Sequence, residues 1–272
     1  MWKNIGKGGI WFAVYFGLQN LFSTILAIAY IFMHPENIPE PGEIDGILNV
    51  LLDAISATIV PALITSALVM ILIYFIHRKV THQPLYAQSL NWQKSIFFVG
   101  LACILNVVCN TLLGFLQSML PPAWVDALES SVGLVTTDAP FWMLLLCTGI
   151  LVPIMEEITF RYGFQHYIAK SNVLAAYILS SIIFGVMHGN PIQIIYATIF
   201  GFILAFVYQK SGNLWYPIII HAVNNTASLI ATQCASDLVY ITVFLIIGIA
   251  ITATSIICFD DVKVIFKKPK QQ

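Results

Sequence analysis

The chain contains few charged residues and lacks the signatures of a soluble enzyme or a metal-binding domain. Only 9% of its 272 residues are Asp, Glu, Lys or Arg, whereas 59% are hydrophobic. The mean hydropathy is +0.86. This composition excludes an ordinary soluble domain and is typical of a polytopic membrane protein. The net charge of −1 gives no indication of a nucleic-acid partner.

Two further absences narrow the chemistry. The five cysteines form no CxxC pair, so we expect them to be small apolar fillers rather than metal ligands or disulfides. No His-Glu-x-x-His sequence occurs, which excludes the standard zincin arrangement.

The first apolar segment is too long for a signal peptide core, and we expect it to be retained.

Eight stretches are long and apolar enough to be membrane helices, since a span needs about 20 mostly apolar residues. They lie near residues 9–33, 46–76, 95–119, 140–170, 173–189, 191–209, 214–233 and 238–258. We therefore predict an all-α membrane bundle of about eight helices. Pro61 and Pro153 predict kinks in the two longest segments.

Basic residues fall on one side of this eight-span topology, with Arg161 as the exception. They are Lys3, Lys7, Arg78, Lys79, Lys94, Lys170, Lys210, Lys263, Lys267, Lys268 and Lys270. The opposite loops carry acidic residues and no Lys or Arg. The positive-inside rule predicts that both termini are cytoplasmic. With short loops throughout, we expect a multi-pass protein of a prokaryotic plasma membrane.

Polar residues within the spans are concentrated in one part of the chain. We predict a single transmembrane domain, in which residues 1–139 are scaffold helices and residues 140–233 are the catalytic core. Residues 238–272 form the last helix and a basic tail. Within the scaffold, Asn106 and Asn110 are explained by hydrogen bonds between helices.

The most unusual feature is a pair of carboxylates, Glu156 and Glu157, followed by Arg161 in a long apolar stretch. Charged groups at membrane depth are costly and mark functional sites. Glu157 and Arg161 are spaced i,i+4, which favours an ion pair, although direct substrate contact is the alternative. Glu156 has no cation one turn away, and a chemical role is the better interpretation.

Helix register suggests partners for Glu156. The fourth and fifth segments form a hairpin that turns near Asn172, with Glu156 and His188 each 16 residues away. Both residues therefore lie about 24 Å from the turn at 1.5 Å per residue. The register predicts that they are neighbours, while the alternative is a buried histidine bonded to a backbone carbonyl. His221 and Asn225 share one helix face at i,i+4. The alternative for Asn225 is a purely structural hydrogen bond between helices.

These residues resemble the signature of the CAAX-protease and bacteriocin-processing family of intramembrane proteases. That signature is Glu-Glu-x-x-x-Arg, then Phe-x-x-x-His, then His-x-x-x-Asn on successive helices. The matching segments are Glu156 to Arg161, Phe184 to His188, and His221 to Asn225. Three motifs in order, each on a separate predicted span, make the resemblance specific over about residues 140–233.

The resemblance implies an all-helical endopeptidase with the bilayer and a peptide or membrane protein as partners. It assigns activation of a water to Glu156 and His188, and oxyanion stabilisation to His221 and Asn225. Glu157, Arg161 and Phe184 would support them. Family members are described both as metalloproteases and as metal-independent glutamate proteases. We favour the metal-free form; in the alternative, Glu156, His188 and His221 would hold Zn²⁺.

Two non-proteolytic functions compete with this interpretation. A bacteriocin self-immunity factor or assembly scaffold would use the polar cluster only to join helices. A proton-coupled transporter would use Glu and His as a proton relay. The transporter is disfavoured because the two halves of the chain show no repeat and no matching polar cluster. The substrate cannot be predicted from the sequence.

Overall fold

The computed structural model describes residues 2–40, 43–81, 90–136, 139–234, 236–263 and 265. Within these residues the regular elements are helices, as the composition predicts, and no strand occurs. In chain order they are α1 (Trp2–Met33), η1 (Pro35–Asn37), α2 (Ile44–Thr81), α3 (Trp92–Met119), α4 (Pro122–Thr136), α5 (Phe141–Leu144), η2 (Leu145–Leu151), α6 (Val152–Glu157), η3 (Ile158–Gln165), α7 (His166–Ala169), α8 (Val173–Val186), α9 (Pro191–Ser211), α10 (Trp215–Ala231), α11 (Asp237–Cys258) and α12 (Asp260–Lys263).

All eight predicted segments are helical. Among the described residues, six helices are long and apolar enough to cross a membrane, counting Phe141–Ala169 as one. The helices α8 and α10, with 14 and 17 residues, are shorter than a typical span. The amphipathic helix α4 occupies one of the predicted connections. The basic tail residues Lys267, Lys268 and Lys270 lie outside the described residues.

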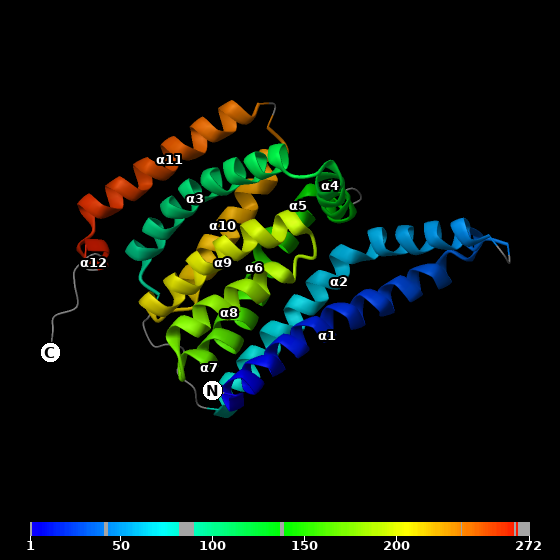
Figure 1. Cartoon of the computed structure of the whole chain (residues 1–272), viewed down its shortest axis with the longest axis horizontal. Coiled ribbons are helices and arrows are strands. Elements are labelled where there is room, and N and C mark those ends of the chain that lie inside the picture. Colours follow the sequence, from blue (N-terminus) through cyan, green and yellow to red (C-terminus); the bar gives the residue numbers. More distant parts are fainter. Residues whose placement is uncertain are drawn as a thin grey trace.

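The helices alternate in direction as the charge pattern predicts. In Figure 1 the start of α1, the end of α2 and the start of α3 lie toward the lower left. The α7–α8 turn and the ends of α9 and α11 lie on the same side. Apart from Arg161, the Lys and Arg residues of the described part of the chain lie at or beside these helix ends. The cytoplasmic placement of both termini stays a prediction, because orientation in the membrane follows from the charge rule alone.

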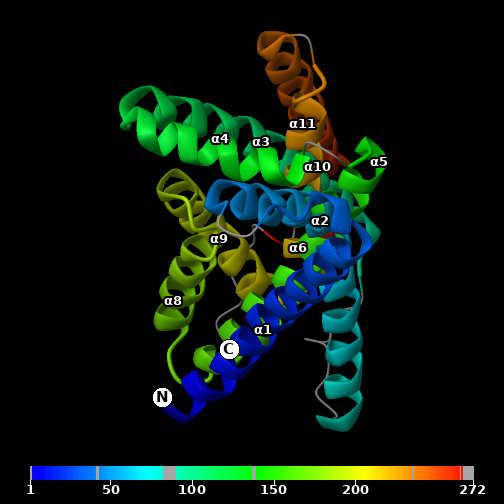
Figure 2. The same ribbon diagram turned by 90° about the vertical axis from the view of Figure 1, so that its right-hand side faces the viewer.

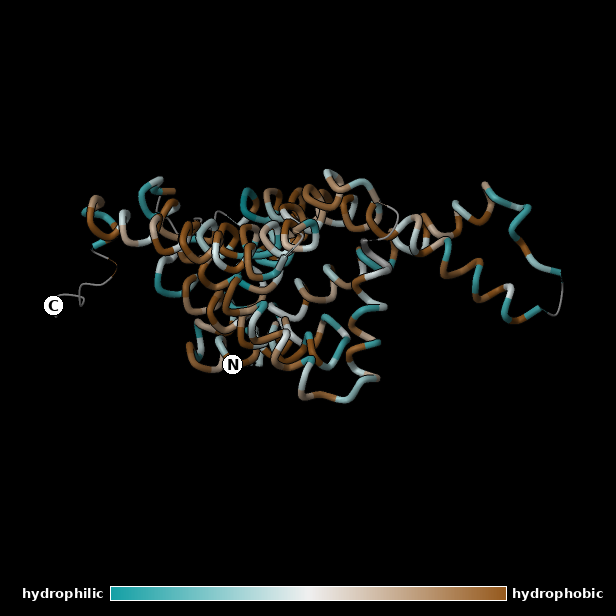
Figure 3. The backbone as a smooth tube through the Cα atoms, turned by 90° about the horizontal axis from the view of Figure 1, so that it is seen from above, coloured by the Kyte–Doolittle hydropathy of each residue, from teal (hydrophilic) through white to brown (hydrophobic). Residues whose placement is uncertain are grey.

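Helices α1 and α2 form a long antiparallel hairpin that extends beyond the rest of the bundle (Figure 1). Figure 3 shows the same arm from above, with a hydrophilic tip. Helix α2 is 38 residues long and contains Pro61. It bends visibly between its two halves in Figures 1 and 2, as expected where proline removes a backbone hydrogen bond.

The helical segment Phe141–Ala169 lies at the centre of the bundle. Parts of it contact α1, α2, α8, α9 and α10. Figure 2 shows α1 crossing diagonally over this segment, between α8 and the C-terminal half of α2. Its η3 part is buried at every position from Ile158 to Gln165. The most polar motif of the sequence therefore lies in the most enclosed place of the fold.

Candidate active site

The paired glutamates lie where the helix geometry changes. The turns η2 and η3 are π-helical, and the six-residue α-helix α6 separates them. Glu156 and Glu157 are the last two residues of α6. Pro153, where the sequence predicts a kink, lies at the start of α6. π-Helical turns are rare and occur frequently at functional sites, since they turn side chains away from the regular α-helical register.

Glu157 and Arg161 form the ion pair that their spacing predicts. Arg161 Nε donates to Glu157 Oε2 at 2.9 Å, and both side chains are completely buried. The guanidinium also lies over the Phe184 ring, 5.3 Å from its centroid. Its Nη1 and Nη2 atoms have no hydrogen-bond partner among the described residues. Because an unpaired buried charge is costly, Arg161 makes an ionised Glu157 tolerable at this depth.

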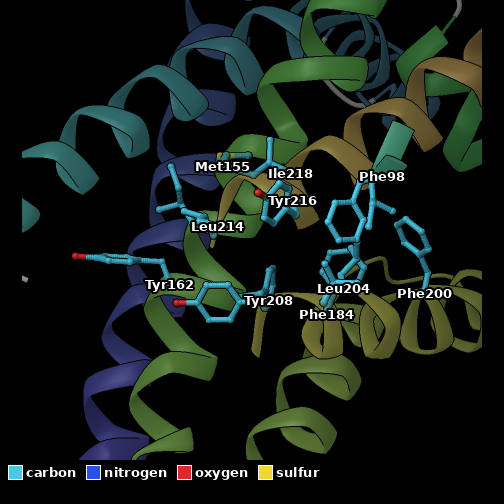
Figure 4. Close-up of a cluster of buried hydrophobic side chains, with 14 of the residues drawn as sticks. Phe98, Met155, Tyr162, Phe184, Phe200, Leu204, Tyr208, Leu214, Tyr216 and Ile218 are labelled. Atoms are coloured by element: carbon cyan, nitrogen blue, oxygen red, sulfur yellow. The ribbon is translucent and has the colours of Figure 1, made fainter. Parts of the chain in front are cut away.

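His221 connects the two glutamates. Its Nδ1 atom lies 3.0 Å from Glu157 Oε1, and its Nε2 atom lies 3.6 Å from Glu156 Oε2. The Glu157 carboxylate accepts a hydrogen bond from Nδ1–H of His221, and Nε2 of the same ring is directed toward Glu156. The imidazole ring is held at its edges by Phe184 and Phe200, at centroid distances of 5.6 and 5.5 Å. Figure 4 shows both phenylalanines within the surrounding apolar cluster.

Charge balance follows from this arrangement. Glu156 and Glu157 contribute two negative charges and Arg161 one positive charge. An imidazolium at His221 makes the group neutral. Buried ionic groups are stable when every charge is compensated and hydrogen-bonded. His221 is thus the member of the group that lies next to both carboxylates, while Arg161 is bonded to Glu157.

Glu156 has a further partner that the sequence motifs do not include. The Tyr15 hydroxyl of α1 donates to Glu156 Oε1 at 3.2 Å, and both residues are buried. Tyr15 lies in the part of the chain predicted to be scaffold. A single tyrosine in an apolar helix carries no signal of this contact, because tyrosine is common in membrane helices near the lipid interface.

His188 occupies a different environment from the one predicted. It lies in the turn after α8, and its Nδ1 atom is 2.9 Å from the Phe184 carbonyl oxygen. This is the backbone contact that the alternative interpretation expects. No hydrogen bond or ion pair joins His188 to Glu156 among the described residues. The Phe184 ring contacts both imidazoles, at centroid distances of 5.1 Å from His188 and 5.6 Å from His221.

The two asparagines of α10 separate into different roles. Asn225 Nδ2 donates to the Thr148 carbonyl of η2 at 3.1 Å. Asn224 faces α3, where Asn106 Nδ2 donates to its carbonyl oxygen at 2.8 Å and to Ser228 Oγ at 2.8 Å. The predicted interhelical role of Asn106 is confirmed, and Tyr240 of α11 also donates to it. Asn225 therefore faces the segment Phe141–Ala169, which contains the paired glutamates.

Comparisons with known proteins agree with this part of the molecule. Residues 138–227 match the family model described as "Type II CAAX prenyl endopeptidase Rce1-like". A curated protein of Bacillus subtilis (strain 168), named "Putative membrane peptidase YdiL", is 35% identical over 85 residues. We refer to residues 138–227, which match this model, as the Rce1-like domain. No solved structure matches the chain.

The extent of these matches limits what they imply. The alignment with the Bacillus protein covers 31% of this chain and 35% of the relative, so the chain spans about a third of that protein's length. The Rce1-like domain contains all the motif residues from Glu156 to Asn225, whereas Tyr15 lies outside it. The bacterial relative and the apolar helices together identify a multi-pass membrane protein of prokaryotic type.

The residues of the Rce1-like domain do not fit a three-ligand zinc site. Among the described residues, no group of three His, Cys, Asp or Glu side chains is placed to hold a metal ion. Glu156 and His221 approach each other, whereas no hydrogen bond or ion pair joins His188 to either of them among the described residues. The proposed chemistry therefore contains no step that depends on a metal.

Proposed function

We propose that this protein is an intramembrane endopeptidase in which Glu156 activates a water molecule. The observation that carries the proposal is the buried group of Glu156, Glu157, Arg161 and His221. Its members are hydrogen-bonded or ion-paired inside an apolar bundle. A structural ion pair requires only Glu157 and Arg161. The second carboxylate and the imidazole beside it provide an acid–base pair, as hydrolysis needs.

In the proposed reaction, Glu156 takes a proton from a water molecule while the oxygen of that water attacks the peptide carbonyl. The proton then passes to the leaving amine. His188 shares in holding the water, since its Nδ1 proton is engaged by the Phe184 carbonyl and its Nε2 lone pair is available. In the part of the chain that the structure describes, His188 and Glu156 share no hydrogen bond or ion pair. For both to hold the same water, substrate binding or a small movement of the α8–α9 turn must bring them together.

His221 and Asn225 supply donors for the developing oxyanion. An imidazolium at His221 directs Nε2–H toward the Glu156 side of the site. Asn225 uses one of its two amide protons for the Thr148 carbonyl and retains the other. Donors fixed in a site that excludes water stabilise a tetrahedral intermediate more strongly than they would in bulk solvent. Glu157 and Arg161 position His221 from behind.

For the substrate we propose a peptide or membrane-protein segment delivered from the bilayer. Cleavage of a prenylated CAAX terminus belongs to the description of the matching family, and it is not transferred to this chain. A non-catalytic self-immunity or scaffold role would need the polar group only for stability. That role predicts equal function for variants that keep the fold but remove the base.

Comparative proteomics of membranes tests the proposal. Cells carrying wild-type protein are compared with cells carrying Glu156→Gln, and new N-termini are mapped in the membrane fraction. The matched control is Glu129→Gln, which changes an exposed glutamate of the peripheral helix α4. We expect at least one cleaved product that disappears in Glu156→Gln and persists in the control. Identical products in all three strains, with the variant folded and abundant, would refute the protease.

A further inference from the structure

We infer that Tyr15, on the first helix, is a positioning residue for the proposed catalytic base Glu156. The inference rests on the proposed function and extends it beyond the Rce1-like domain, which begins at residue 138. The Tyr15 hydroxyl donates to Glu156 Oε1 at 3.2 Å. Glu156 Oε2 is then the oxygen that faces His221 Nε2 at 3.6 Å. One oxygen is held by a neutral donor while the other is left for chemistry.

Helix α1 is placed for this contact by a single stripe of residues. Its buried residues are Gly8, Trp11 and Tyr15, which share one helix face at spacings of three and four. The stripe packs on η3: a Cβ on Gly8 would lie 3.2 Å from the Phe164 Cα atom. A Cβ on Gly163 would lie 2.4 Å from Trp11 Cγ. The two glycines allow the close approach that brings Tyr15 within reach of Glu156.

The Tyr15 side chain is itself fixed from two sides. Its ring meets Phe160 edge to face at a centroid distance of 5.6 Å. Gln19, one turn further along α1, is placed to hydrogen-bond the Tyr15 hydroxyl. The ring contact sets the direction of the phenol, and Gln19 lies near its oxygen. The Tyr15 proton is thereby directed to the Glu156 carboxylate.

This geometry gives Tyr15 a role that a packing residue would not have. A hydrogen bond to an ionised carboxylate favours its charged form, and the charged form is the one that accepts a proton from water. Without the hydroxyl, the carboxylate loses a donor and can rotate about its last side-chain torsion, which is broad. Tyr15 touches neither the reacting peptide nor the water in this scheme and acts through Glu156.

The test compares Tyr15→Phe with Tyr162→Phe in proteoliposomes. Tyr162 is equally buried, and its hydroxyl bonds to His77 Nδ1 at 3.0 Å rather than to the site. The substrate is a fluorogenic peptide built on the cleavage site mapped in the proteome comparison. We expect kcat to fall about 10- to 100-fold in Tyr15→Phe with KM little changed, the range for losing a hydrogen bond to a charged group. Tyr162→Phe should keep the wild-type kcat and KM.

The outcomes separate this inference from the proposed function. If the wild type does not cleave, both ideas are overturned. If the wild type cleaves, Glu156→Gln does not, and Tyr15→Phe keeps the wild-type kcat, only the role of Tyr15 is overturned. Equal losses in Tyr15→Phe and Tyr162→Phe also overturn it, because they indicate a packing effect. Should Tyr15→Phe not fold, Gln19→Leu tests the same chain of bonds: reduced kcat with unchanged KM supports the inference, and unchanged kcat contradicts it.

Discussion

Two ion pairs of nearly equal length offer a sharp test of how burial sets the energetics of this protein. Arg161 Nε and Glu157 Oε2 are 2.9 Å apart with both side chains fully buried. Lys263 Nζ and Asp260 Oδ1 are 2.8 Å apart, with 43% and 95% of their side chains exposed. Distance alone predicts similar contributions to stability. Physical reasoning predicts very different ones.

The perturbation is replacement of each cation by methionine, which keeps an unbranched apolar side chain. Arg161→Met leaves the Glu157 carboxylate buried without its principal counter-charge, so we expect a loss of about 3–5 kcal/mol in the free energy of unfolding. His221 still bonds to Glu157 and limits the loss to that range. Lys263→Met removes a solvent-screened pair and should cost less than about 1 kcal/mol.

Thermal unfolding in detergent, followed by circular dichroism, measures the difference. A loss of this size corresponds to a Tm lower by roughly 6–20 °C for Arg161→Met, against a few degrees at most for Lys263→Met. The double variant Glu157→Gln with Arg161→Met provides the compensation test. Because it removes both charges, it should be more stable than Arg161→Met alone. Equal Tm values for the two single variants, or a double variant less stable than Arg161→Met, would refute the reasoning.

Two further predictions concern packing and cofactor use. Gly163→Ala should destabilise the protein by about 1–3 kcal/mol, because the added methyl group is overpacked against Trp11. It should also lower the cleavage rate by displacing α1. The control is Gly17→Ala, whose added Cβ meets nothing within 4 Å and which should keep the wild-type Tm and activity. Chelators such as EDTA and 1,10-phenanthroline should leave the cleavage rate unchanged, and a loss of activity that Zn²⁺ restores would contradict the metal-free mechanism.

Much of the fold could be predicted because membrane helices are recognisable in a sequence by their length and apolar composition. All eight predicted segments are helical, and the charge alternation matches the directions of the helix ends. Local helix spacing also predicted the Glu157–Arg161 pair, and an isolated amide in an apolar span predicted the interhelical bonds of Asn106. These features depend on composition or on residues one turn apart, which the sequence displays directly.

Contacts between helices that are distant in the sequence were harder to predict. The predicted approach of Glu156 to His188 assumed an α-helical rise along both arms of the hairpin. The arm from Glu156 to the turn contains the π-helical stretch Ile158–Gln165, which has more residues per turn and advances less per residue. The other arm ends its helix at Val186, before His188 is reached. Among the described residues no hydrogen bond or ion pair joins His188 to Glu156, and His221 is the imidazole that lies 3.6 Å from it.

The different surroundings of the two glutamates decide which can act as the base. Glu157 is completely buried and has charged or hydrogen-bonding partners on both carboxylate oxygens, Arg161 at 2.9 Å and His221 at 3.0 Å. Protonating Glu157 would leave the Arg161 charge uncompensated in an apolar core, which is strongly unfavourable. Glu156 has a neutral phenol at 3.2 Å and a more distant imidazole nitrogen at 3.6 Å. If Glu156 takes the proton of the attacking water, as we propose, the Arg161 cation keeps its bond to Glu157 and is not left unpaired. The proposed function therefore gives these adjacent glutamates different roles, because only Glu157 is bound to a group that cannot change its charge.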